Sequence, residues 1–151
     1  MLIRDRIYGR FELKEAVILD LLKSKEFERL RGVSQGGLPQ AYTPVPTYSR
    51  FEHSIGVMLL LRILNASLEE QIAGLLHDVS HTAFSHIADI ALSDSYLKGT
   101  EDYHERIKEN FLGSTKIPSI LGKHGFDRKV IFDTKRFSLL EMGEPDLCAD
   151  R

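Results

Sequence analysis

The segment GLLHDVSHTAFSH, residues 74–86, concentrates ionisable side chains that can bind a metal ion or move protons. It holds three of the six histidines of the chain, and an aspartate directly follows the first of them. His77 and Asp78 come after the apolar run AGLL, where two adjacent ionisable groups are costly to bury unless something binds them. An isolated buried histidine is more often simply hydrogen-bonded, but the adjacent pair favours a bound divalent cation.

A shared metal ion needs ligands from a second helix. Successive helical residues diverge by about 100°, so His77 and Asp78 can reach one ion only in the crease between helices. His53 lies on the preceding predicted helix, and antiparallel packing of the two helices would bring it beside the pair. Mixed imidazole and carboxylate ligands suit one divalent ion with open water positions: Mn, Fe, Co, Ni, Zn or Mg.

Hydrolysis of a phosphate ester or anhydride is the chemistry that such a site favours. A bound cation lowers the pKa of its water and polarises a phosphoryl oxygen. Histidines that titrate near neutrality can protonate the leaving oxygen, and His81, His86 and His104 are available for this. Asp89 lies three residues after His86, which places both on the same face if the segment is helical, and there it would orient the imidazole and raise its pKa.

Two predicted helices position these residues. Two pairs of residues match capping boxes ahead of apolar runs: Ser49 with Glu52, and Ser67 with Glu70. They predict one helix from about residue 50 to 65 and another from residue 68 to about 79. In the first helix we expect four residues to face inward: Ile55, Leu59, Leu60 and Ile63.

The rest of the chain is also typical of helices. Residues 14–22 carry apolar side chains at helical spacing, Ser24 suits an N-cap, and Gly125 suits a helix end. Residues 32–49 are rich in Gly and Pro and should form an irregular loop. Further helix starts are predicted at Asp102 with Glu105 and at Pro145, whereas the best strand pattern is the weak KVIF at 129–132. We therefore expect an all-α fold, a helical bundle with the metal site between helices.

Length and composition indicate one domain spanning residues 1–151, with 42% apolar residues to form its core. The net charge of −2 disfavours polymeric nucleic acid and an acidic membrane as partners, so a small molecule is expected, and a homo-oligomer is left open. The lone Cys148 cannot form an internal disulfide, and the N-terminus lacks the apolar stretch of a signal peptide. These features favour a cytoplasmic location without a membrane span.

Three segments in this order resemble the HD-domain metal-dependent phosphohydrolases, whose signature is a His, a His-Asp pair and a distant Asp. They are RFEHSIGV at residues 50–57, LLHDVSHTAFSH at 75–86 and LCADR at 147–151. The chain looks most similar to the branch of deoxynucleoside triphosphate triphosphohydrolases, which has sequences like IRDRIYGRFEL and FERLRGVSQGG of this chain. The resemblance spans nearly the whole chain and implies the helical HD domain.

The resemblance implies a set of four metal ligands: His53, His77, Asp78 and Asp150. Asp146 lies one helical turn before Asp150 and is the alternative fourth ligand, although the following Arg151 favours Asp150. The family continues past this Asp-Arg pair, whereas the sequence stops at Arg151. We therefore expect the domain to be truncated at its C-terminus.

Other positions match those that handle protons and substrate in the family. His86 and Asp89 match positions linked to proton transfer, and Gln35 matches a glutamine that contacts the sugar hydroxyl. The phosphate-contacting positions are matched by three residues: His81, His104 and Arg50. Without the resemblance, Gln35 is ordinary loop composition, His104 could be a solvated helix residue and Arg50 could form an ion pair on a helix surface.

The segment after the His-Asp pair departs from the usual family pattern. Ser80, Thr82 and Ala83 stand where Gly, Gly and Pro are common, so the local backbone is expected to differ. Two classes of function remain open: a metal-dependent phosphohydrolase acting on a nucleotide or a related phosphate ester, such as a dNTP, and a regulatory module that binds nucleotides without chemistry. The complete set of candidate ligands and histidines favours the enzyme.

Overall fold

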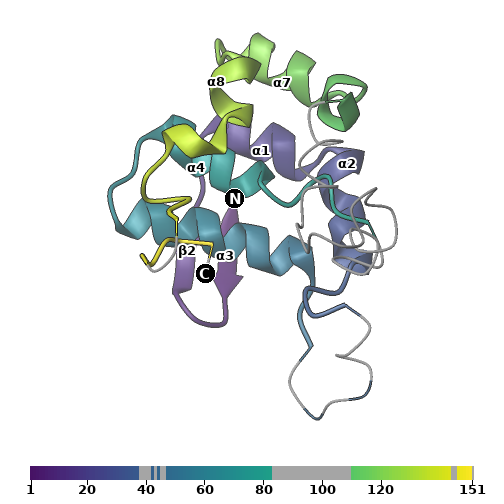
Figure 1. Ribbon diagram of the computed structural model, residues 1–151, viewed down its shortest axis with the longest axis vertical. Helices are drawn as coiled ribbons and strands as arrows, with labels where there is room; N and C mark the ends of the chain where they lie inside the picture. The colour runs from purple at the N-terminus through teal and green to yellow at the C-terminus, as the bar shows by residue number, and fades with distance from the viewer. Residues whose placement is uncertain (38–41, 43, 45–46, 83–109, 144–145, 151) are drawn as a thin grey trace.

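Short helices form the body of the protein in the computed structural model (Figure 1). The structure describes all residues except 38–41, 43, 45–46, 83–109, 144–145 and 151. In chain order the elements are β1 (Leu2–Asp5), β2 (Gly9–Glu12), α1 (Ala16–Leu22), α2 (Lys25–Glu28), η1 (Arg29–Gly32), α3 (Arg50–Ile63), α4 (Leu68–Leu76), α7 (Ile117–Lys123), α8 (Arg128–Phe132) and η3 (Thr134–Arg136). The predicted all-α fold is confirmed, with a small two-stranded sheet beside the helices.

The first helix of the central pair, α3, begins at the predicted capping box. Ser49 Oγ accepts a hydrogen bond from Glu52 N at 3.2 Å, and Glu52 Oε2 accepts one from Ser49 N at 2.8 Å. The expected inward face is only partly correct, because Ile63 is 47% exposed. The buried stripe passes through Met58 and Leu61 at helical spacing, so Ile63 points away from it.

The second helix of the pair, α4, begins as predicted but ends early. Ser67 Oγ accepts a hydrogen bond from Glu70 N at 3.1 Å. The expected second arm of this capping box is wrong, because Glu70 Oε1 accepts hydrogen bonds from Leu139 N and Leu140 N instead. The helix ends at Leu76 rather than near residue 79, which leaves His77 as its C-cap.

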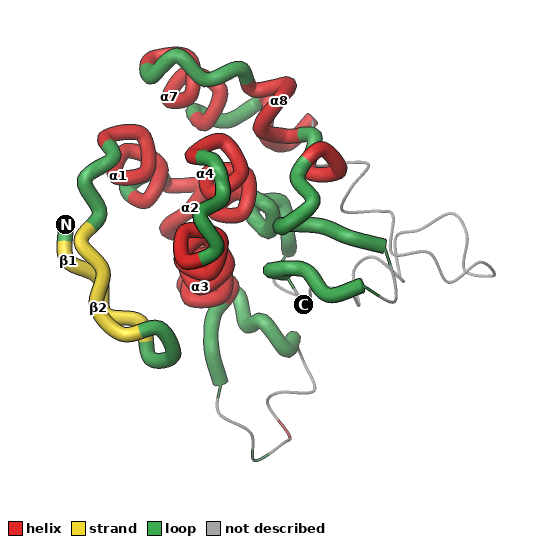
Figure 2. Tube along the Cα trace, turned by 90° about the vertical axis from the view of Figure 1, so that its left-hand side faces the viewer, coloured by secondary structure: helices red, strands yellow, loops and turns green. Residues whose placement is uncertain are grey.

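Gly74 allows α3 and α4 to pack closely. A Cβ atom added at Gly74 would lie 2.4 Å from Leu61 Cδ1 and 3.2 Å from Val57 Cγ1, both on α3. The side view shows the two helices packed together, with α1 beside them (Figure 2). This close approach brings the start of α3 and the end of α4, and hence His53 and His77, to the same place.

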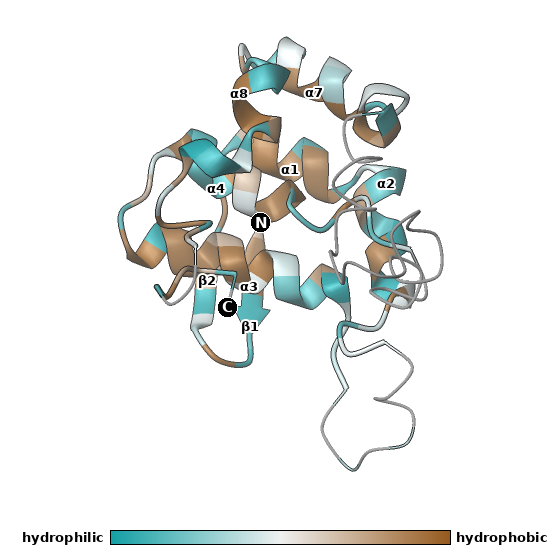
Figure 3. Ribbon diagram, viewed as in Figure 1, coloured by the Kyte–Doolittle hydropathy of each residue, from teal (hydrophilic) through white to brown (hydrophobic). Residues whose placement is uncertain are grey.

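The N-terminal hairpin was not expected from the sequence. β1 pairs with β2 in antiparallel register, with Ile3 opposite Phe11, and the turn is held by Asp5 Oδ1, which accepts hydrogen bonds from Ile7 N and Tyr8 N at 2.7 and 2.8 Å. β1 (LIRD) and β2 (GRFE) mix hydrophilic and hydrophobic residues, whereas α1 is largely hydrophobic (Figure 3). Such a half-exposed hairpin buries too little apolar surface to produce a clear alternating pattern.

Two weaker predictions for the C-terminal part are wrong. The KVIF segment lies within α8, because Asp127 caps that helix by accepting a hydrogen bond from Lys129 N at 2.9 Å. The final helix is not formed over residues 146–150, which make a loop and a turn. Pro145 itself, like the predicted helix start at Asp102 and Glu105, lies outside the described residues.

The end of α7 agrees with its prediction and is tied to α1. Gly125 follows the helix with a positive φ of 79°, which glycine adopts readily. Asp20 of α1 accepts hydrogen bonds from Lys123 Nζ at 2.8 Å and His124 Nε2 at 2.9 Å. Among the described residues, no helix has both the length and the apolar character that a membrane crossing requires.

Candidate metal centre

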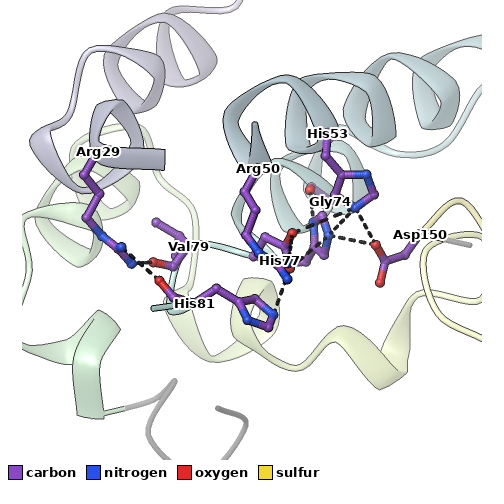
Figure 4. A network of polar contacts seen from close by, with 9 residues as sticks. Arg29, Arg50, His53, Gly74, His77, Val79, His81 and Asp150 are labelled. Carbon is purple, nitrogen blue, oxygen red and sulfur yellow. Dashed lines mark hydrogen bonds and ion pairs between the residues drawn. The ribbon is translucent and has the colours of Figure 1, made fainter. Parts of the chain in front are cut away.

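Three predicted ligands from three separate segments converge on one point (Figure 4). His53 lies in the second turn of α3, His77 caps the end of α4, and Asp150 lies in the C-terminal turn. Asp150 Oδ1 is 2.9 Å from His53 Nε2 and 2.8 Å from His77 Nε2. The two Nε2 atoms are 3.3 Å apart.

These spacings fit a shared metal ion. Ligand atoms that each lie roughly 2.0–2.2 Å from one ion are about 3 Å from one another. His77 Nδ1 lies 2.6 Å from the carbonyl oxygen of Gly74, to which it can donate a hydrogen bond, and this tautomer leaves Nε2 free to bind a cation. The donor set of two imidazoles and a carboxylate therefore suits a divalent ion with open positions.

Asp78 lies beside this group but faces two other partners. Its Oδ2 atom is 2.6 Å from Arg50 Nη1, and its Oδ1 atom is 3.1 Å from His81 Nε2. The nearest distances to the histidines of the cluster are 3.5 Å, from His77 Nε2, and 3.9 Å, from His53 Nε2. The structure thus brings three of the four predicted ligands together and sets Asp78 next to them; a direct bond from Asp78 to the ion stays a prediction.

Arg50 is buried inside the protein rather than on the surface of α3. Its exposed fraction is 1%, and its ion pair with Asp78 links the start of α3 to the turn after α4. The ion pair that the sequence offered as an alternative is therefore present, but in the interior. A contact between Arg50 and a substrate phosphate stays a prediction.

Opposite charges in the site shift the pKa values of His77, Asp78 and Asp150 towards their charged forms. Burial favours neutral His77, but Asp78 and Asp150 outweigh this effect and raise its pKa to about 9. Burial likewise favours protonated Asp78, yet His77, His81 and Arg50 hold its pKa well below the usual range. The pKa of Asp150 is also lowered, because His53 and His77 outweigh its burial. Both carboxylates are therefore ionised and ready to bind cations at neutral pH.

Arg29 is a site residue that sequence reasoning missed. From η1, its guanidinium donates a hydrogen bond to the carbonyl oxygen of His81 at 2.9 Å and another to that of Val79 (Figure 4). It therefore holds the turn that carries Asp78 and His81. The bonds join residues about fifty positions apart and end on backbone atoms, so no local sequence pattern could indicate them.

A cavity of about 820 Å³ opens beside the ligand cluster. His53 and Asp150 form part of its wall, as does Gln35, which sequence similarity had linked to a sugar hydroxyl. The hairpin and η1 contribute positively charged side chains, and two tyrosines also line the space: Arg4, Arg6, Arg31, Tyr8 and Tyr48. The cavity thus combines the candidate ligands with cationic and aromatic groups, and three further carboxylates also line it: Asp5, Glu28 and Glu52.

The remaining predicted site residues have different outcomes. His81 is buried and hydrogen-bonded to Asp78. Of the two aspartates offered as the last ligand, it is Asp150 that joins the described cluster. Three of the predicted catalytic residues lie outside the described residues, so their roles stay predictions: His86, Asp89 and His104.

Comparison with known proteins gives a consistent result. A family model described as HD domain matches residues 50–139. A protein of Cordyceps militaris named metal-dependent phosphohydrolase cns2 is 46% identical over 151 residues, covering 100% of this chain and 43% of the relative. The uncharacterized protein YdhJ of Bacillus subtilis is 46% identical over 152 residues, covering 100% and 45%.

More distant similarity extends to human deoxynucleoside triphosphate triphosphohydrolase SAMHD1, at 31% identity over 142 residues. That alignment covers 82% of this chain and 22% of the human protein. The chain therefore spans less than half the length of these curated relatives.

Proposed function

Because the chain belongs to the HD domain family, we propose that it is a metal-dependent phosphohydrolase that acts on a nucleotide or a related phosphate ester. The observation that carries this proposal is the convergence of His53 Nε2, His77 Nε2 and Asp150 Oδ1, which lie within 2.8–3.3 Å of one another. A divalent cation held by these atoms would supply a Lewis acid and hydroxide near neutral pH.

The protein's own groups orient the site and manage charge. Arg50 and His81 bind opposite oxygens of Asp78, which fixes the carboxylate next to the two ligand histidines. Arg29 holds the backbone of the same turn. His81 Nε2 lies 3.1 Å from Asp78 Oδ1, so this carboxylate orients the imidazole, and in this proposal His81 contacts a phosphate oxygen.

His86 and Asp89 complete the proposed proton transfer. In this proposal His86 protonates the leaving oxygen with Asp89 behind it, and His104 contacts a phosphate group. The His86→Ala variant should then lower turnover by about 100-fold or more, with metal binding nearly unchanged. An ester with an activated leaving group should be less impaired than one with a poor leaving group; equal loss for both would make His86 a positioning residue instead.

A nucleotide is the substrate class that the cavity favours. Its cationic side chains suit a phosphate chain, and its tyrosines suit a base, next to the ligand cluster. The name of one relative, a deoxynucleoside triphosphate triphosphohydrolase, supports the same class, and the name of another, a metal-dependent phosphohydrolase, supports the reaction type alone. We include release of triphosphate from a deoxynucleoside triphosphate as the specific form of the reaction, with Gln35 contacting the sugar.

A screen of metals against substrates tests the proposal. Deoxynucleoside triphosphates, nucleoside monophosphates and an aryl phosphate are incubated with Mn²⁺, Co²⁺, Ni²⁺, Zn²⁺, Fe²⁺ or Mg²⁺, and the phosphate products are identified. Hydrolysis that depends on the metal and is lost in His53→Ala supports the proposal. Binding of nucleotides at this cavity without any hydrolysis would instead support the regulatory module.

The proposal also covers the partner and the location of the protein. The near-neutral charge favours a small-molecule substrate over a polymeric nucleic acid. The lone Cys148 favours the cytoplasm. A homo-oligomer is compatible with this function, and sedimentation of the purified chain would measure it.

A further inference from the structure

Glu70 is a buried carboxylate in the first turn of α4 that neither the helix cap nor the ligand cluster uses. Its exposed fraction is 8%. Its Oε1 atom accepts hydrogen bonds from Leu139 N at 2.9 Å and Leu140 N at 3.1 Å. A carboxylate that accepts two backbone N–H groups forms charge-assisted bonds, which are stronger than neutral ones. Glu70 therefore fixes the backbone of residues 139–140 against α4.

The segment that Glu70 holds is hydrogen-bonded to the residue that precedes Asp150. The carbonyl oxygen of Leu139 accepts a hydrogen bond from Ala149 N at 2.8 Å, and Ala149 directly precedes Asp150. Leu140 is buried against the same helix, because its Cδ1 atom would be 3.5 Å from a Cβ atom at Gly74. A continuous series of contacts therefore runs from Glu70 to the turn that presents Asp150.

This route matters because Asp150 has no helix to orient it. Residues 146–150 form a loop and a turn, and the side chain of Asp150 is partly exposed. α4 carries His77 at its end, and Glu70 lies seven residues earlier, about 10 Å along the helix axis. The same helix therefore supplies one ligand directly and holds the segment that places another.

We propose that Glu70 is a positioning residue of the metal centre, which sets Asp150 beside His53 and His77 through Leu139 and Ala149. The inference rests on the proposed function, because it assigns the three ligands to a metal site. Glu70 acts through backbone hydrogen bonds and does not touch the ion. Its effect on metal affinity is therefore expected to depend on Asp150.

Four variants of the full chain distinguish the effects of the length of the Glu70 side chain, of its charge and of a general change in stability. Glu70→Ala removes the acceptor, Glu70→Gln keeps an acceptor oxygen without the charge, and Glu70→Asp keeps the charge on a shorter side chain. Glu69→Ala is the control, because Glu69 is an exposed residue in the same turn of α4. Circular dichroism establishes that each variant is folded, and Glu70→Gln and Glu70→Asp remain available if Glu70→Ala does not fold.

The first measurement needs no metal. Amide hydrogen exchange of the metal-free protein should be faster at residues 139, 140 and 149 in Glu70→Ala and Glu70→Asp than in the wild type. Glu69→Ala should exchange like the wild type at these positions, and Glu70→Gln, which keeps the acceptor without the charge, should lie between the wild type and Glu70→Ala. Unchanged exchange at residue 149 in Glu70→Ala and Glu70→Asp would overturn the proposed route to Asp150.

The second measurement is Co²⁺ affinity, followed by the visible absorption of the bound ion. Glu70→Ala should weaken binding by about 10-fold, the lower end of the usual effect of residues that orient ligands. In an Asp150→Ala background, Glu70→Ala should cause little further loss. A loss of the same size in both backgrounds would show a general structural effect and overturn the inference.

The outcome for Glu70 can be told apart from the outcome for the proposed function. Weakened Co²⁺ binding in Glu70→Ala, in a protein that hydrolyses none of the phosphate esters, would support the positioning role and contradict the enzyme proposal. If the wild type binds no Co²⁺, the metal-dependent function and the role in a metal centre are both overturned, while amide exchange still decides whether Glu70 holds the Asp150 turn.

Discussion

The two sides of the candidate metal centre are held in different ways. His53 and His77 belong to α3 and α4, which begin at serine N-caps and pack closely at Gly74. Asp150 lies in a turn that is hydrogen-bonded to Leu139 and, through it, to Glu70. The helical side is thus determined by local sequence and helix packing, whereas the carboxylate side depends on contacts between distant parts of the chain.

The largest effect is expected from breaking the helical side. In Gly74→Ala, the new Cβ atom would lie 2.4 Å from Leu61 Cδ1, so either the buried Leu61 side chain must change its rotamer or the helices must move apart. Overpacking of this kind costs about 1–3 kcal/mol of unfolding free energy, and helix movement that separates His53 from His77 should weaken metal binding as well. Urea denaturation and Co²⁺ titration measure the two effects.

Gly56→Ala is the matched control for this prediction. Gly56 lies within α3, and a Cβ atom there meets nothing within 4 Å. Replacement of a helical glycine by alanine should stabilise the protein by roughly 0.5–1 kcal/mol. If Gly74→Ala were as stable as Gly56→Ala, close packing of α3 on α4 would not be what positions the histidines.

The pH dependence of metal binding tests the charges that join the two sides. Near neutral pH the metal-free protein holds a proton on His77, whose pKa is raised to about 9. A metal ion must displace this proton, so the apparent affinity should rise about tenfold between pH 7 and 8 and level off above about 9. Co²⁺ titrations at several pH values measure this slope; an affinity that is constant from pH 6.5 to 8.5 would contradict it.

The raised pKa of His77 also predicts how the stability of the metal-free protein changes with pH. A raised pKa contributes stability that is fully present below the ordinary histidine value of 6.5 and is lost as the pH rises through about 9. The melting temperature of the metal-free protein should therefore fall between pH 6.5 and 9. Saturating metal should remove this dependence, because the ion replaces the proton as the partner of the two carboxylates.

A smaller loss of stability is expected from changing the contacts of the turn after α4, which carries Val79 and His81. Arg29→Ala removes two hydrogen bonds from a half-buried guanidinium to the carbonyl oxygens of Val79 and His81. The loss should be about 1–2 kcal/mol of unfolding free energy, with weaker metal binding because the turn follows His77. Lys25→Ala, an exposed position of α2, should change stability by less than about 0.5 kcal/mol. Equal losses of unfolding free energy in the two variants would contradict the role of Arg29 in holding this turn.

The smallest effect is expected far from the metal centre. Lys123 and His124 lower the pKa of Asp20 to about 2 by hydrogen bonding and charge. A lowered pKa contributes stability that is present above the ordinary value near 4 and is lost as the pH falls towards 2. Asp20→Asn should therefore lower the melting temperature slightly at pH 7 and leave it unchanged near pH 2, with no effect on metal binding at neutral pH.

The same contrast explains how far the sequence could predict the structure. The starts of α3 and α4 were predicted because serine N-caps and helical periodicity are local signals, and the His53–His77 pairing followed from antiparallel packing. The hydrogen bonds of the Arg29 and Glu70 side chains could not be predicted, since their partners are backbone atoms of distant segments. The resemblance to HD phosphohydrolases named Asp150, but the turn that presents it replaced the expected final helix.

The most direct test of the central claim is a crystal structure of the protein soaked with Mn²⁺ or Co²⁺, with the ion located by its anomalous scattering. We predict one ion whose distances to His53 Nε2, His77 Nε2 and Asp150 Oδ1 are each about 2.0–2.6 Å. The same map would show whether Asp78 supplies a fourth ligand. An ion bound elsewhere, or any of these three atoms more than about 3 Å from it, would contradict the account.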